Sequence, residues 1–475
     1  MRMTKIVATL GPATDDKEVL RNILLAGANV VRLNFSHGND EERVARIALV
    51  NELREELDLP IALLADTRGP EVRIGVFAKD KIELIAGERF ILTTYACEGD
   101  ANRVSISYDG LPHDVSRGTR ILIDDGLIEL VVDSVTDAEI HTTIINGGVI
   151  SSRKGVNIPS VHLNLPFISS KDRADLRFIA KNGFDFIAAS FTQKAQDIQQ
   201  LRDELHRLNA EQIRVIAKIE NAEGVANMQE ILAASDGIMV ARGDMGVEIA
   251  LEELPIIQKE LIKTAYSSSK NVITATQMLD SMMHNPRPTR AETSDVANAI
   301  YDGTSAIMLS GETAMGKYPV EAVRTMARIA ERAERDIDYR KRFKQQEPKS
   351  DATVTNAISH ATVTTAHDLS ARAILSVTKS GATARNISSY RPAYPIIACT
   401  TEQRVQRQLN LAWGVAPLLM DEQDNTDSLI QSAIEISHGK GLLEEGDLVV
   451  VTAGVPLGVS GTTNLLKVHV MGDTL

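Results

Sequence analysis

The stretch RVIAKIENAEGVANMQEILAASDGIMVARGD, residues 214–244, contains the pattern that decides the fold. It has two apolar runs that end in charge: the first places Lys218 and Glu220 together, and the second places Arg242 and Asp244 together. Continuous apolar runs joined by a helical segment are typical of parallel strands buried on both faces of a sheet. The stretch therefore predicts two neighbouring strands whose carboxyl ends carry charge.

The same alternation of strand and helix extends over most of the first 340 residues. Helical patterns such as AQDIQQLRDELHRL, residues 195–208, separate the apolar runs. The runs occupy residues 5–10, 29–35, 61–67, 184–191, 214–220, 237–244, 271–278 and 305–312. Eight such units predict an α/β fold of the (β/α)8 class, a TIM barrel, in which an active site lies at the carboxyl ends of the strands.

Residues 71–167 interrupt this alternation between the third and fourth strands. The block has short alternating runs and turn signals such as Asp125-Gly126, and it predicts a small inserted antiparallel β-barrel. Pro70 and Pro166 mark its entry and exit at the catalytic rim, where a lid could close and exclude water. A passive insertion is the alternative, but RKGVNIP, residues 153–159, brings two cations back toward the rim.

The last part of the chain predicts a third domain. A charged stretch over residues 340–354 is typical of a linker, and the strand and helix patterns that follow predict an open α/β layer. We therefore expect a barrel of residues 1–70 and 168–340, a lid domain of residues 71–167, and a C-terminal α/β effector and oligomerisation domain of residues 341–475.

One loop of this last domain could hold a phosphate. TKSGAT, residues 378–383, lies between a strand and a helix, where hydroxyl groups and glycine amides can bind an anion. A second glycine-rich loop, residues 453–464, could close over the same site. The candidate effector residues are Thr378, Lys379, Ser380, Gly381 and Thr383. A turn with a purely structural role is the alternative for each loop.

Composition restricts the classes of partner. The chain has 475 residues and a formal net charge of -13, which weighs against nucleic acid because binding a phosphate backbone needs a broad basic face. No window approaches the ~20 uninterrupted apolar residues that a bilayer requires, and the N-terminus has no signal-peptide pattern. Cys97 and Cys399 are too far apart in sequence to indicate a disulfide framework or a zinc cluster. We expect a cytoplasmic protein that binds no membrane and takes an anionic small molecule.

Polar side chains end most of the predicted barrel strands. They are Arg32, Asn34, Ser36, Asp66, Thr67, Ser190, Lys218, Glu220, Arg242, Asp244, Thr276, Gln277, Ser310 and Glu312. Strand ends are often polar simply because they reach water. That explanation weakens when seven strands end in this way, because isolated buried charges are costly. The set predicts one polar site at one rim.

Glu220 and Asp244 predict a metal site on neighbouring strands. Their carboxylate oxygens suit Mg2+ or Mn2+, with substrate and water in the remaining positions. Strand alternation points Lys218 to the same face as Glu220, where an ammonium can neutralise a phosphoryl group in transfer. A structural salt bridge is the alternative, and the repeated pattern in Arg242 and Asp244 weighs against it. The groups are typical of phosphoryl transfer.

Several long segments are specific enough to compare with known families. They are VVRLNFSHG (30–38), DTRGPEVR (66–73), VIAKIENAEGV (215–225), MVARGDMGVEI (239–249), ITATQMLDSM (273–282), NPRPTRAE (285–292) and DVANAIYDGTSAIMLSGET (295–313). Together they resemble the pyruvate kinase family, in its order and over most of the chain. The resemblance implies transfer of the phosphoryl group of phosphoenolpyruvate to ADP, which gives pyruvate and ATP at the end of glycolysis. It also implies a homotetramer.

The resemblance assigns roles around the substrate. It implies that Glu220 and Asp244 hold Mg2+, that Lys218 stabilises the phosphoryl group, and that Arg32 and Arg73 help to bind it. The backbone of Gly243 and Asp244, with Thr276, would receive the substrate carboxylate. Thr276, Ser310 and Glu312 line the rim from which a hydroxyl or a water relay could protonate the enolate, and the identity of that acid stays open.

The resemblance also implies sites for K+ and the nucleotide. The oxygen donors Asn34, Ser36, Asp66 and Thr67, with Ser190 nearby, are similar to the K+ site of the family, although a solvated rim is the alternative. Glu71 stands where a glutamate accompanies K+ dependence in that family. The nucleotide contacts implied are His37, Lys154, Asn34 and Arg73, with Lys154 carried by the lid.

The sequence departs from the family at some positions. Gln193 replaces a frequent arginine, which puts a secondary contact in doubt. Members activated by fructose 1,6-bisphosphate often carry a basic residue where this chain has Val455-Pro456-Leu457. The effector expected is therefore a monophosphate, either a sugar phosphate or AMP. We also expect no phosphohistidine-like domain of the kind that some bacterial members append.

Two other functions compete with this interpretation. One is a Mg2+-dependent lyase on the same barrel, acting through an enolate of pyruvate; it leaves unexplained the lid with Lys154, the lysine beside the metal, and the oxygen-donor cluster. The other is a sugar-phosphate sensor that has lost activity, against which the intact Lys218, Glu220, Asp244 and Thr276 argue.

Overall fold

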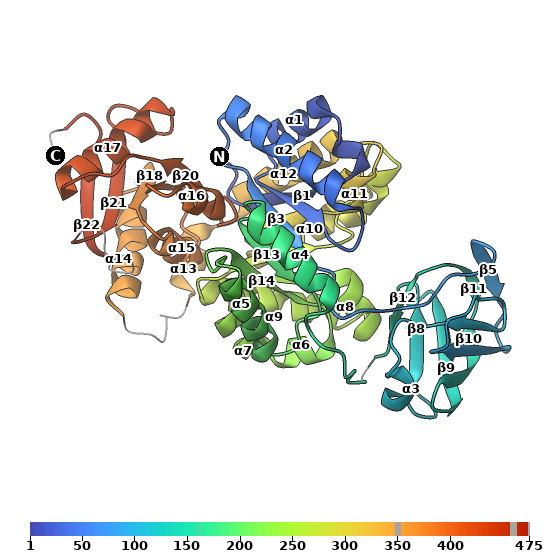
Figure 1. The fold of residues 1–475 in the computed structure, drawn as a ribbon. Coiled ribbons are helices and arrows are strands. Elements are labelled where there is room, and N and C mark those ends of the chain that lie inside the picture. Colours follow the sequence, from blue (N-terminus) through green and yellow to red (C-terminus); the bar gives the residue numbers. More distant parts are fainter. Residues whose placement is uncertain (160, 347–352, 457–462, 474–475) are drawn as a thin grey trace.

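The computed structural model describes residues 1–159, 161–346, 353–456 and 463–473. Figure 1 shows a central barrel with the inserted lid lobe at one side and a C-terminal lobe at the other. None of the helices in these ranges is long and apolar enough to cross a membrane.

Eight parallel strands close the central barrel, as the alternation of strands and helices predicted. Their order around the barrel is β1 (Lys5–Thr9), β17 (Ala306–Leu309), β16 (Asn271–Ala275), β15 (Gly237–Ala241), β14 (Arg214–Ile219), β13 (Phe186–Ala189), β3 (Ala62–Asp66) and β2 (Val30–Asn34). One set of apolar side chains fills the barrel interior and another packs against the helices outside. This burial of both faces explains the continuous apolar runs in the sequence.

One set of helices covers the outside of the barrel, and a second set of short ones lies where strands end. The covering helices are α1 (Lys17–Leu25), α2 (Asp40–Leu57), α4 (Ser170–Lys181), α5 (Ala195–Arg207), α7 (Met228–Ala234), α9 (Leu254–Ser267), α10 (Arg290–Asp302) and α12 (Pro319–Asp336). The short ones are η1 (Pro12–Thr14), α6 (Ala222–Ala226), α8 (Arg242–Glu248), η2 (Asp280–Met283) and α11 (Gly311–Ala314). α10 begins with a capping box between Thr289 and Glu292, which fixes where that helix starts.

The lid lobe is built on a seven-stranded sheet with its own apolar core. The sheet order is β4 (Val72–Arg73), β12 (Gly155–Asn157), β8 (Arg120–Ile123), β9 (Ile128–Val135), β10 (Glu139–Asn146), β6 (Arg89–Thr93) and β7 (Arg103–Ser105). A separate pair joins β5 (Lys81–Leu84) and β11 (Gly148–Ser151), and α3 (Leu111–Asp114) lies between β7 and β8. A bridge between Ile74 and Ile106 joins the two edges of the sheet. The pairing of β6 with β7 is parallel, so the antiparallel prediction was wrong for that pair.

The C-terminal lobe is an open α/β layer, as predicted. Its sheet has the order β20 (Val415–Leu419), β19 (Ile396–Thr400), β18 (Ala373–Val377), β21 (Leu448–Gly454) and β22 (Thr463–Val470), with β22 antiparallel to β21. The helices are α14 (Val354–Asp368), α15 (Ala382–Ser389), α16 (Gln403–Leu409) and α17 (Thr426–Gly439). The predicted linker differs in part, because Tyr339–Lys344 forms a further helix, α13.

The C-terminal lobe covers the amino-terminal ends of the barrel strands. Asn410 donates to the carbonyls of Asn29 and Pro60, just before β2 and β3. The side chain of Leu411 is fully buried among the residues that fill the barrel interior. Arg391 is buried too, and its guanidinium lies 5.0 Å from the ring of Trp413 and donates to the carbonyl of Gly303. The barrel and the C-terminal lobe therefore share a core.

Candidate active site

Lys218 is the centre of a buried charge cluster at the carboxyl end of β14. Its Nζ lies 2.8 Å from Oε1 of Glu220 and 3.1 Å from Oδ1 of Asp66, and it donates to Oγ of Ser190 at 2.7 Å. Burial alone would lower the pKa of Lys218, but the carboxylates of Asp66, Glu220 and Asp244 outweigh it and raise that pKa above its ordinary value. Lys218 is therefore a permanent positive charge in a nearly buried site.

Glu220 is positioned by both of its oxygens. Oε1 contacts Lys218, and Oε2 accepts the backbone N–H of Phe191 at 2.6 Å. Phe191 has a φ of 55°, an uncommon left-handed conformation for a side chain of this size. Burial and the nearby Asp244 raise the pKa of Glu220 in spite of Lys218. Glu220 is thus a buried carboxylate with a second carboxylate nearby, an arrangement that a divalent cation would stabilise.

Arg32 reaches the same cluster from β2. Its Nε lies 2.6 Å from Oδ2 of Asp66, and Nη1 donates to Oγ1 of Thr9 at 3.0 Å. Burial opposes ionisation of Asp66, but Arg32 and Lys218 hold its pKa below the usual range. Asp66 thus links the two cations that were predicted to bind the phosphoryl group.

The predicted K+ donors lie together at the ends of β2, β3 and β13. Asn34 and Asp66 are register partners on adjacent strands, and Oδ1 of Asn34 accepts the backbone N–H of Ser36. The hydroxyl of Ser190 donates to the carbonyl of Thr67 at 2.7 Å and lies 3.2 Å from Oδ1 of Asp66. A compact set of hard oxygen atoms is what a K+ ion needs.

Thr276 and Gly243 meet where β15 and β16 end. The N–H of Gly243 donates to Oγ1 of Thr276 at 2.8 Å. Thr276 and Gln277 both have positive φ, 69° and 52°, so this turn is held away from the ordinary backbone regions. The strained turn places the Thr276 hydroxyl beside the backbone of Gly243.

Arg242, one of the charged residues at the predicted strand ends, is directed toward Asp295 and the Thr276 turn. Its Nη1 lies 2.6 Å and 2.7 Å from the two carboxylate oxygens of Asp295, and its Nη2 donates to the carbonyl of Thr276 at 2.6 Å. The physical reason is that β15 ends at Ala241, so Arg242 begins α8 and the strand alternation no longer sets its direction. Arg242 fixes the Thr276 turn.

Glu312 is held by two backbone groups. It is 1% exposed, and it accepts the N–H of Ser310 at 2.7 Å and the N–H of Leu279 at 3.0 Å. Burial raises the pKa of Glu312. Both carboxylate oxygens therefore have structural partners, and the side chain joins α11 to the segment after Thr276.

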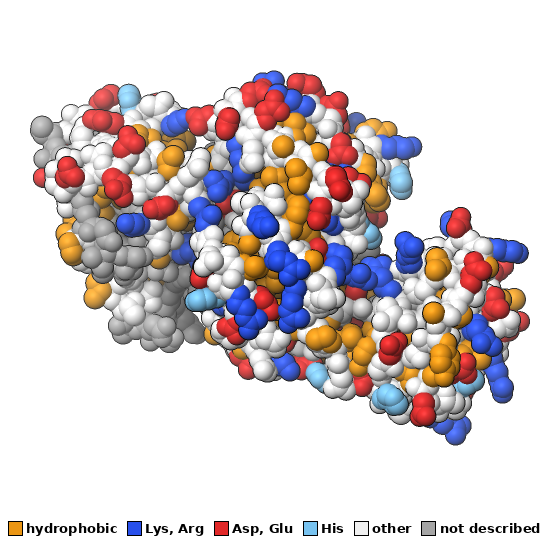
Figure 2. Space-filling model, in the orientation of Figure 1, with side chains coloured by type: hydrophobic (Ala, Val, Ile, Leu, Met, Phe, Trp, Pro, Cys, Tyr) orange, Lys and Arg blue, Asp and Glu red, His pale blue; other side chains and the backbone are white. Residues whose placement is uncertain are grey.

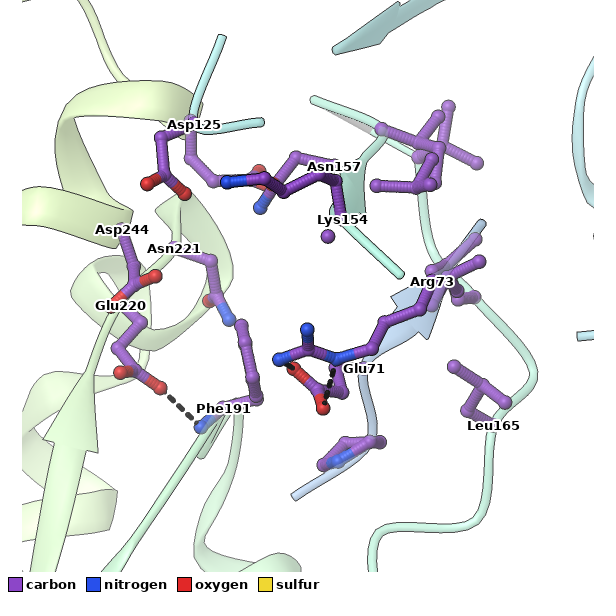
Figure 3. Close-up of a pocket in the computed structure, with 18 of the residues that line it drawn as sticks. Glu71, Arg73, Asp125, Lys154, Asn157, Leu165, Phe191, Glu220, Asn221 and Asp244 are labelled. Carbon is purple, nitrogen blue, oxygen red and sulfur yellow. Dashed lines mark hydrogen bonds and ion pairs between the residues drawn. The ribbon is translucent and has the colours of Figure 1, made fainter. Parts of the chain in front are cut away.

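A cleft of about 350 Å³ separates the barrel rim from the lid lobe (Figure 3). Its lining includes His37, Arg73, Lys154, Glu220 and Asp244. A second hollow of about 770 Å³ continues beyond α8, and its lining includes Gly243, Asp244, Thr276, Ser310 and Glu312. Asp244 lines both, so the predicted nucleotide and substrate residues meet at this carboxylate. On the face seen in Figure 2, lysine and arginine side chains gather over the barrel next to the lid.

The cations of the cleft have carboxylate partners. Nζ of Lys154 lies 2.8 Å from Asp124, and Arg73 donates to Glu71 through Nε at 2.7 Å and Nη2 at 2.9 Å. Burial and the positive charge of Arg73 lower the pKa of His37, so its imidazole is neutral at pH 7.

The sequence did not single out Asp125 of the lid as a site residue. Asp125 lies in the turn between β8 and β9 and lines both hollows together with Asp244. Figure 3 shows the two side chains next to each other on one side of the view, with the Asp125 carboxylate directed toward Asp244. The only signal in the sequence was the pair of acidic residues in a turn, which any solvated hairpin can have.

The loop predicted to bind an effector precedes α15. The hydroxyl of Thr378 accepts the N–H of Gly381, and Thr383 bonds to Thr463 at 2.6 Å. The carbonyl of Ser380 accepts from Arg214, the first residue of β14, at 3.4 Å. Lys379 is exposed, and residues 457–462 of the second loop, Leu457 among them, lie outside the described residues.

Comparisons with known proteins agree with this architecture. The family described as "Pyruvate kinase, barrel domain" matches residues 1–323, and "Pyruvate kinase, alpha/beta domain" matches residues 356–469. A pyruvate kinase of Geobacillus stearothermophilus is 50% identical, over 100% of this chain and 81% of its own. One of Clostridium acetobutylicum is 48% identical, over 99% of this chain and 100% of its own. A crystal structure of a pyruvate kinase from Cryptosporidium parvum superposes with a TM-score of 0.93 at 38% identity, covering 99% of this chain and 96% of that one.

Proposed function

The chain belongs to the pyruvate kinase family, and we propose which of its residues carry the reaction that defines this family. The protein is a phosphotransferase that moves the phosphoryl group of phosphoenolpyruvate to ADP and gives pyruvate and ATP. The observation that carries the assignment of residues is Lys218, held between Glu220, Asp66 and Ser190 at the mouth of the barrel.

Glu220 and Asp244 are the proposed ligands of Mg2+, or of Mn2+ in its place. Two carboxylates at adjacent strand ends fit a hard cation, and burial together with the nearby Asp244 raises the pKa of Glu220, an effect that a bound cation would oppose. When bound, the metal would neutralise and orient the substrate oxygens.

Lys218 and Arg32 are the proposed groups for the phosphoryl oxygens. Both are nearly buried, and Asp66 fixes both, so they need little rearrangement as charge moves between oxygens. Arg73 approaches from the lid side of the same cleft. The backbone of Gly243 and Asp244, with the hydroxyl of Thr276, is the proposed seat of the substrate carboxylate.

The hydroxyl of Thr276, or a water molecule beside Ser310, is the proposed proton source for the enolate. Glu312 is a weaker candidate for direct transfer because two backbone N–H groups already occupy its oxygens. We propose that Glu312 instead supports a proton relay that runs through Ser310.

The remaining sites rest on the family resemblance together with local geometry. Asn34, Ser36, Asp66 and Thr67 would hold K+, and His37, Lys154, Asn34 and Arg73 would contact the nucleotide. Thr378, Lys379, Ser380, Gly381 and Thr383 would bind a sugar phosphate or AMP, and Arg214 connects that loop to the strand of Lys218. We further propose a cytoplasmic homotetramer and a lid of residues 71–167 that moves against residues 1–70 and 168–340, with residues 341–475 as the effector and oligomerisation domain.

The test is a coupled assay of pyruvate release from phosphoenolpyruvate and ADP. We expect turnover that needs Mg2+, increases with K+, and responds to a panel of sugar phosphates and AMP. If Lys218→Met or Glu220→Gln has the same turnover as the wild type, the role assigned to that residue is wrong. Cleavage of an oxoacid without ATP formation would favour the lyase alternative.

A further inference from the structure

A buried arginine of α2 holds the loop of residues 35–38, which lies between β2 and α2. Nη2 of Arg43 donates to the backbone carbonyls of His37 at 2.8 Å and of Gly38 at 3.1 Å. The same nitrogen lies 3.5 Å from the carbonyl oxygen of Phe35. One guanidinium thus contacts three of the four carbonyls of this loop.

The arginine itself rests on a rigid aromatic cluster. Arg43 is 5% exposed, and its guanidinium carbon lies 4.5 Å from the centroid of the Phe35 ring. Phe35 is fully buried, and its ring makes edge contacts with the rings of Phe178 and Phe184, each at 5.9 Å between centroids. A planar guanidinium can stack on such a ring and donate to several acceptors at once, which an ammonium cannot do.

A purely structural role in α2 does not explain these contacts. The helix is already capped by Asn39, whose side chain accepts the N–H of Glu42. Nη1 of Arg43 pairs with Asp40 at 2.7 Å, but that carboxylate is 63% exposed, and exposed ion pairs contribute little. Nε of Arg43 has no hydrogen-bond partner in the part of the chain that the structure describes, which makes burial of the side chain costly. The carbonyls of the loop are therefore its main partners.

The loop has little other support on this side. Nζ of Lys171, on α4, donates to the carbonyl of Phe35 at 3.0 Å, and the N–H of Phe35 donates to the carbonyl of Asp66 at 2.9 Å. These bonds fix the start of the loop. At its far end, Arg43 holds the backbone of His37, whose side chain lines the cleft.

We propose that Arg43 is a positioning residue for the nucleotide and K+ sites, because it fixes the backbone that carries His37 and Ser36. Without the guanidinium, the loop would sample several conformations, and ADP and K+ would each have to order it on binding. The cost falls on binding of these two ligands. The groups proposed for the phosphoryl oxygens lie outside the loop. The proposal rests on the roles of His37 and Ser36 in the proposed function.

The test compares Arg43→Met with Arg46→Met in the full-length protein. Arg46 lies three residues further along α2, and its hydrogen bonds go to Asp15, so its replacement removes an arginine and an ion pair from the same helix. Steady-state kinetics are measured with ADP, K+ and phosphoenolpyruvate varied in turn. Hydrogen-exchange mass spectrometry follows the amides of residues 34–38.

In Arg43→Met, we expect the KM for ADP and the K+ concentration for half-maximal activity to rise about tenfold each, as for a loop that is competent to bind about a tenth of the time. The kcat at saturating ADP and K+ should stay within about twofold of the wild type, and the amides of the loop should exchange about tenfold faster. Arg43→Lys, which keeps the charge but has a single donor nitrogen, should be intermediate. Arg46→Met should match the wild type in all three quantities.

Equal KM values for ADP and equal loop exchange in Arg43→Met and Arg46→Met would overturn the proposal. A lower kcat with unchanged KM values would overturn it too. If exchange in Arg43→Met is faster throughout the barrel, the variant is destabilised as a whole, and Arg43→Lys decides. A wild-type KM for ADP in Arg43→Lys, together with faster loop exchange, would then contradict the link between the loop and the nucleotide.

His37→Ala keeps the assignment of the nucleotide site separate. If His37→Ala raises the KM for ADP and Arg43→Met does not, the role of His37 stands and only the positioning role of Arg43 fails. If His37→Ala leaves the KM for ADP unchanged, the assignment of His37 itself is wrong, and the proposal for Arg43 fails with it.

Discussion

Arg242 binds the backbone carbonyl of Thr276 at 2.6 Å and so fixes a residue whose own φ is 69°. The same guanidinium is held in place by both carboxylate oxygens of Asp295. Two charged side chains that touch no proposed ligand thus support the turn at which the substrate carboxylate is expected to bind.

The first prediction concerns this support. Arg242→Lys should lower kcat/KM for phosphoenolpyruvate by about 10²-fold, because a lysine cannot pair with Asp295 and hold Thr276 at the same time. The KM for ADP should change little. Steady-state kinetics with each substrate varied in turn checks this split.

Arg332→Lys is the matched control, because Arg332 is an exposed arginine that pairs with Asp336 at 3.7 Å. If Arg242→Lys and Arg332→Lys have the same kcat/KM, Arg242 does not position Thr276.

The second prediction concerns Lys218. Lys218→Met should lower turnover by at least ~10³-fold, the scale of a major electrostatic stabiliser. Mg2+ binding should become tighter, since the ammonium no longer competes for Glu220 and Asp66. Turnover and calorimetric Mg2+ titration together test the role, with the exposed Lys263→Met on α9 as the control. Loss of both activity and Mg2+ binding would indicate a damaged site instead.

The third prediction concerns stability and pH. Lys5 is buried between the barrel and the C-terminal lobe, its Nζ donates to the carbonyl of Val415 at 2.6 Å, and burial lowers its pKa to about 7. The unfolded chain has a lysine pKa of ~10.4. At a pH between the folded and the unfolded pKa, Lys5 is therefore neutral in the folded state and protonated in the unfolded state. The free energy of unfolding should therefore rise with pH from about 7 to about 10, by up to ~1.4 kcal/mol per pH unit from this group.

Urea unfolding at several pH values isolates this contribution. Lys5→Met should remove it, whereas Lys181→Met, at an exposed position of α4, should keep it. Parallel pH profiles for the wild type and Lys5→Met would show that Lys5 does not titrate in this range.

The fourth prediction concerns the effector loop. Thr383→Val should abolish stimulation by the monophosphate that activates the wild type, because it removes a hydroxyl at the start of α15 that now bonds to Thr463. The measured quantity is the ratio of activity with and without each sugar phosphate or AMP. Thr364→Val, whose hydroxyl bonds within α14, should keep the ratio. An unchanged ratio in Thr383→Val would place the effector elsewhere.

The sequence predicted the barrel and most of the rim because both depend on local pattern. Each strand is a continuous apolar run, and Lys218 and Glu220 share a face by alternation within β14. Strand alternation could not predict the direction of Arg242, because β15 ends one residue before it, at Ala241. No periodicity in the sequence marks the point where a strand gives way to a helix at a polar rim.

The features that the sequence did not reveal depend on contacts between distant segments. Asp125 becomes a site residue only because the lid sheet aims its turn at α8. The partners of Glu312 are backbone N–H groups, which every residue except proline has, so no side-chain pattern could identify them. Short helices such as α13 give too few residues for a periodic signal.

Leu411 has a consequence for how the enzyme is divided. The catalytic barrel is not closed by its own residues alone: Leu411 of the C-terminal lobe fills the end of the barrel opposite the active site. Separating the two lobes would expose that end of the barrel interior to water, so we expect that the barrel does not fold stably without the C-terminal lobe. A ligand bound at the predicted effector loop would therefore act on a lobe that shares its core with the barrel, and the two lobes should unfold together.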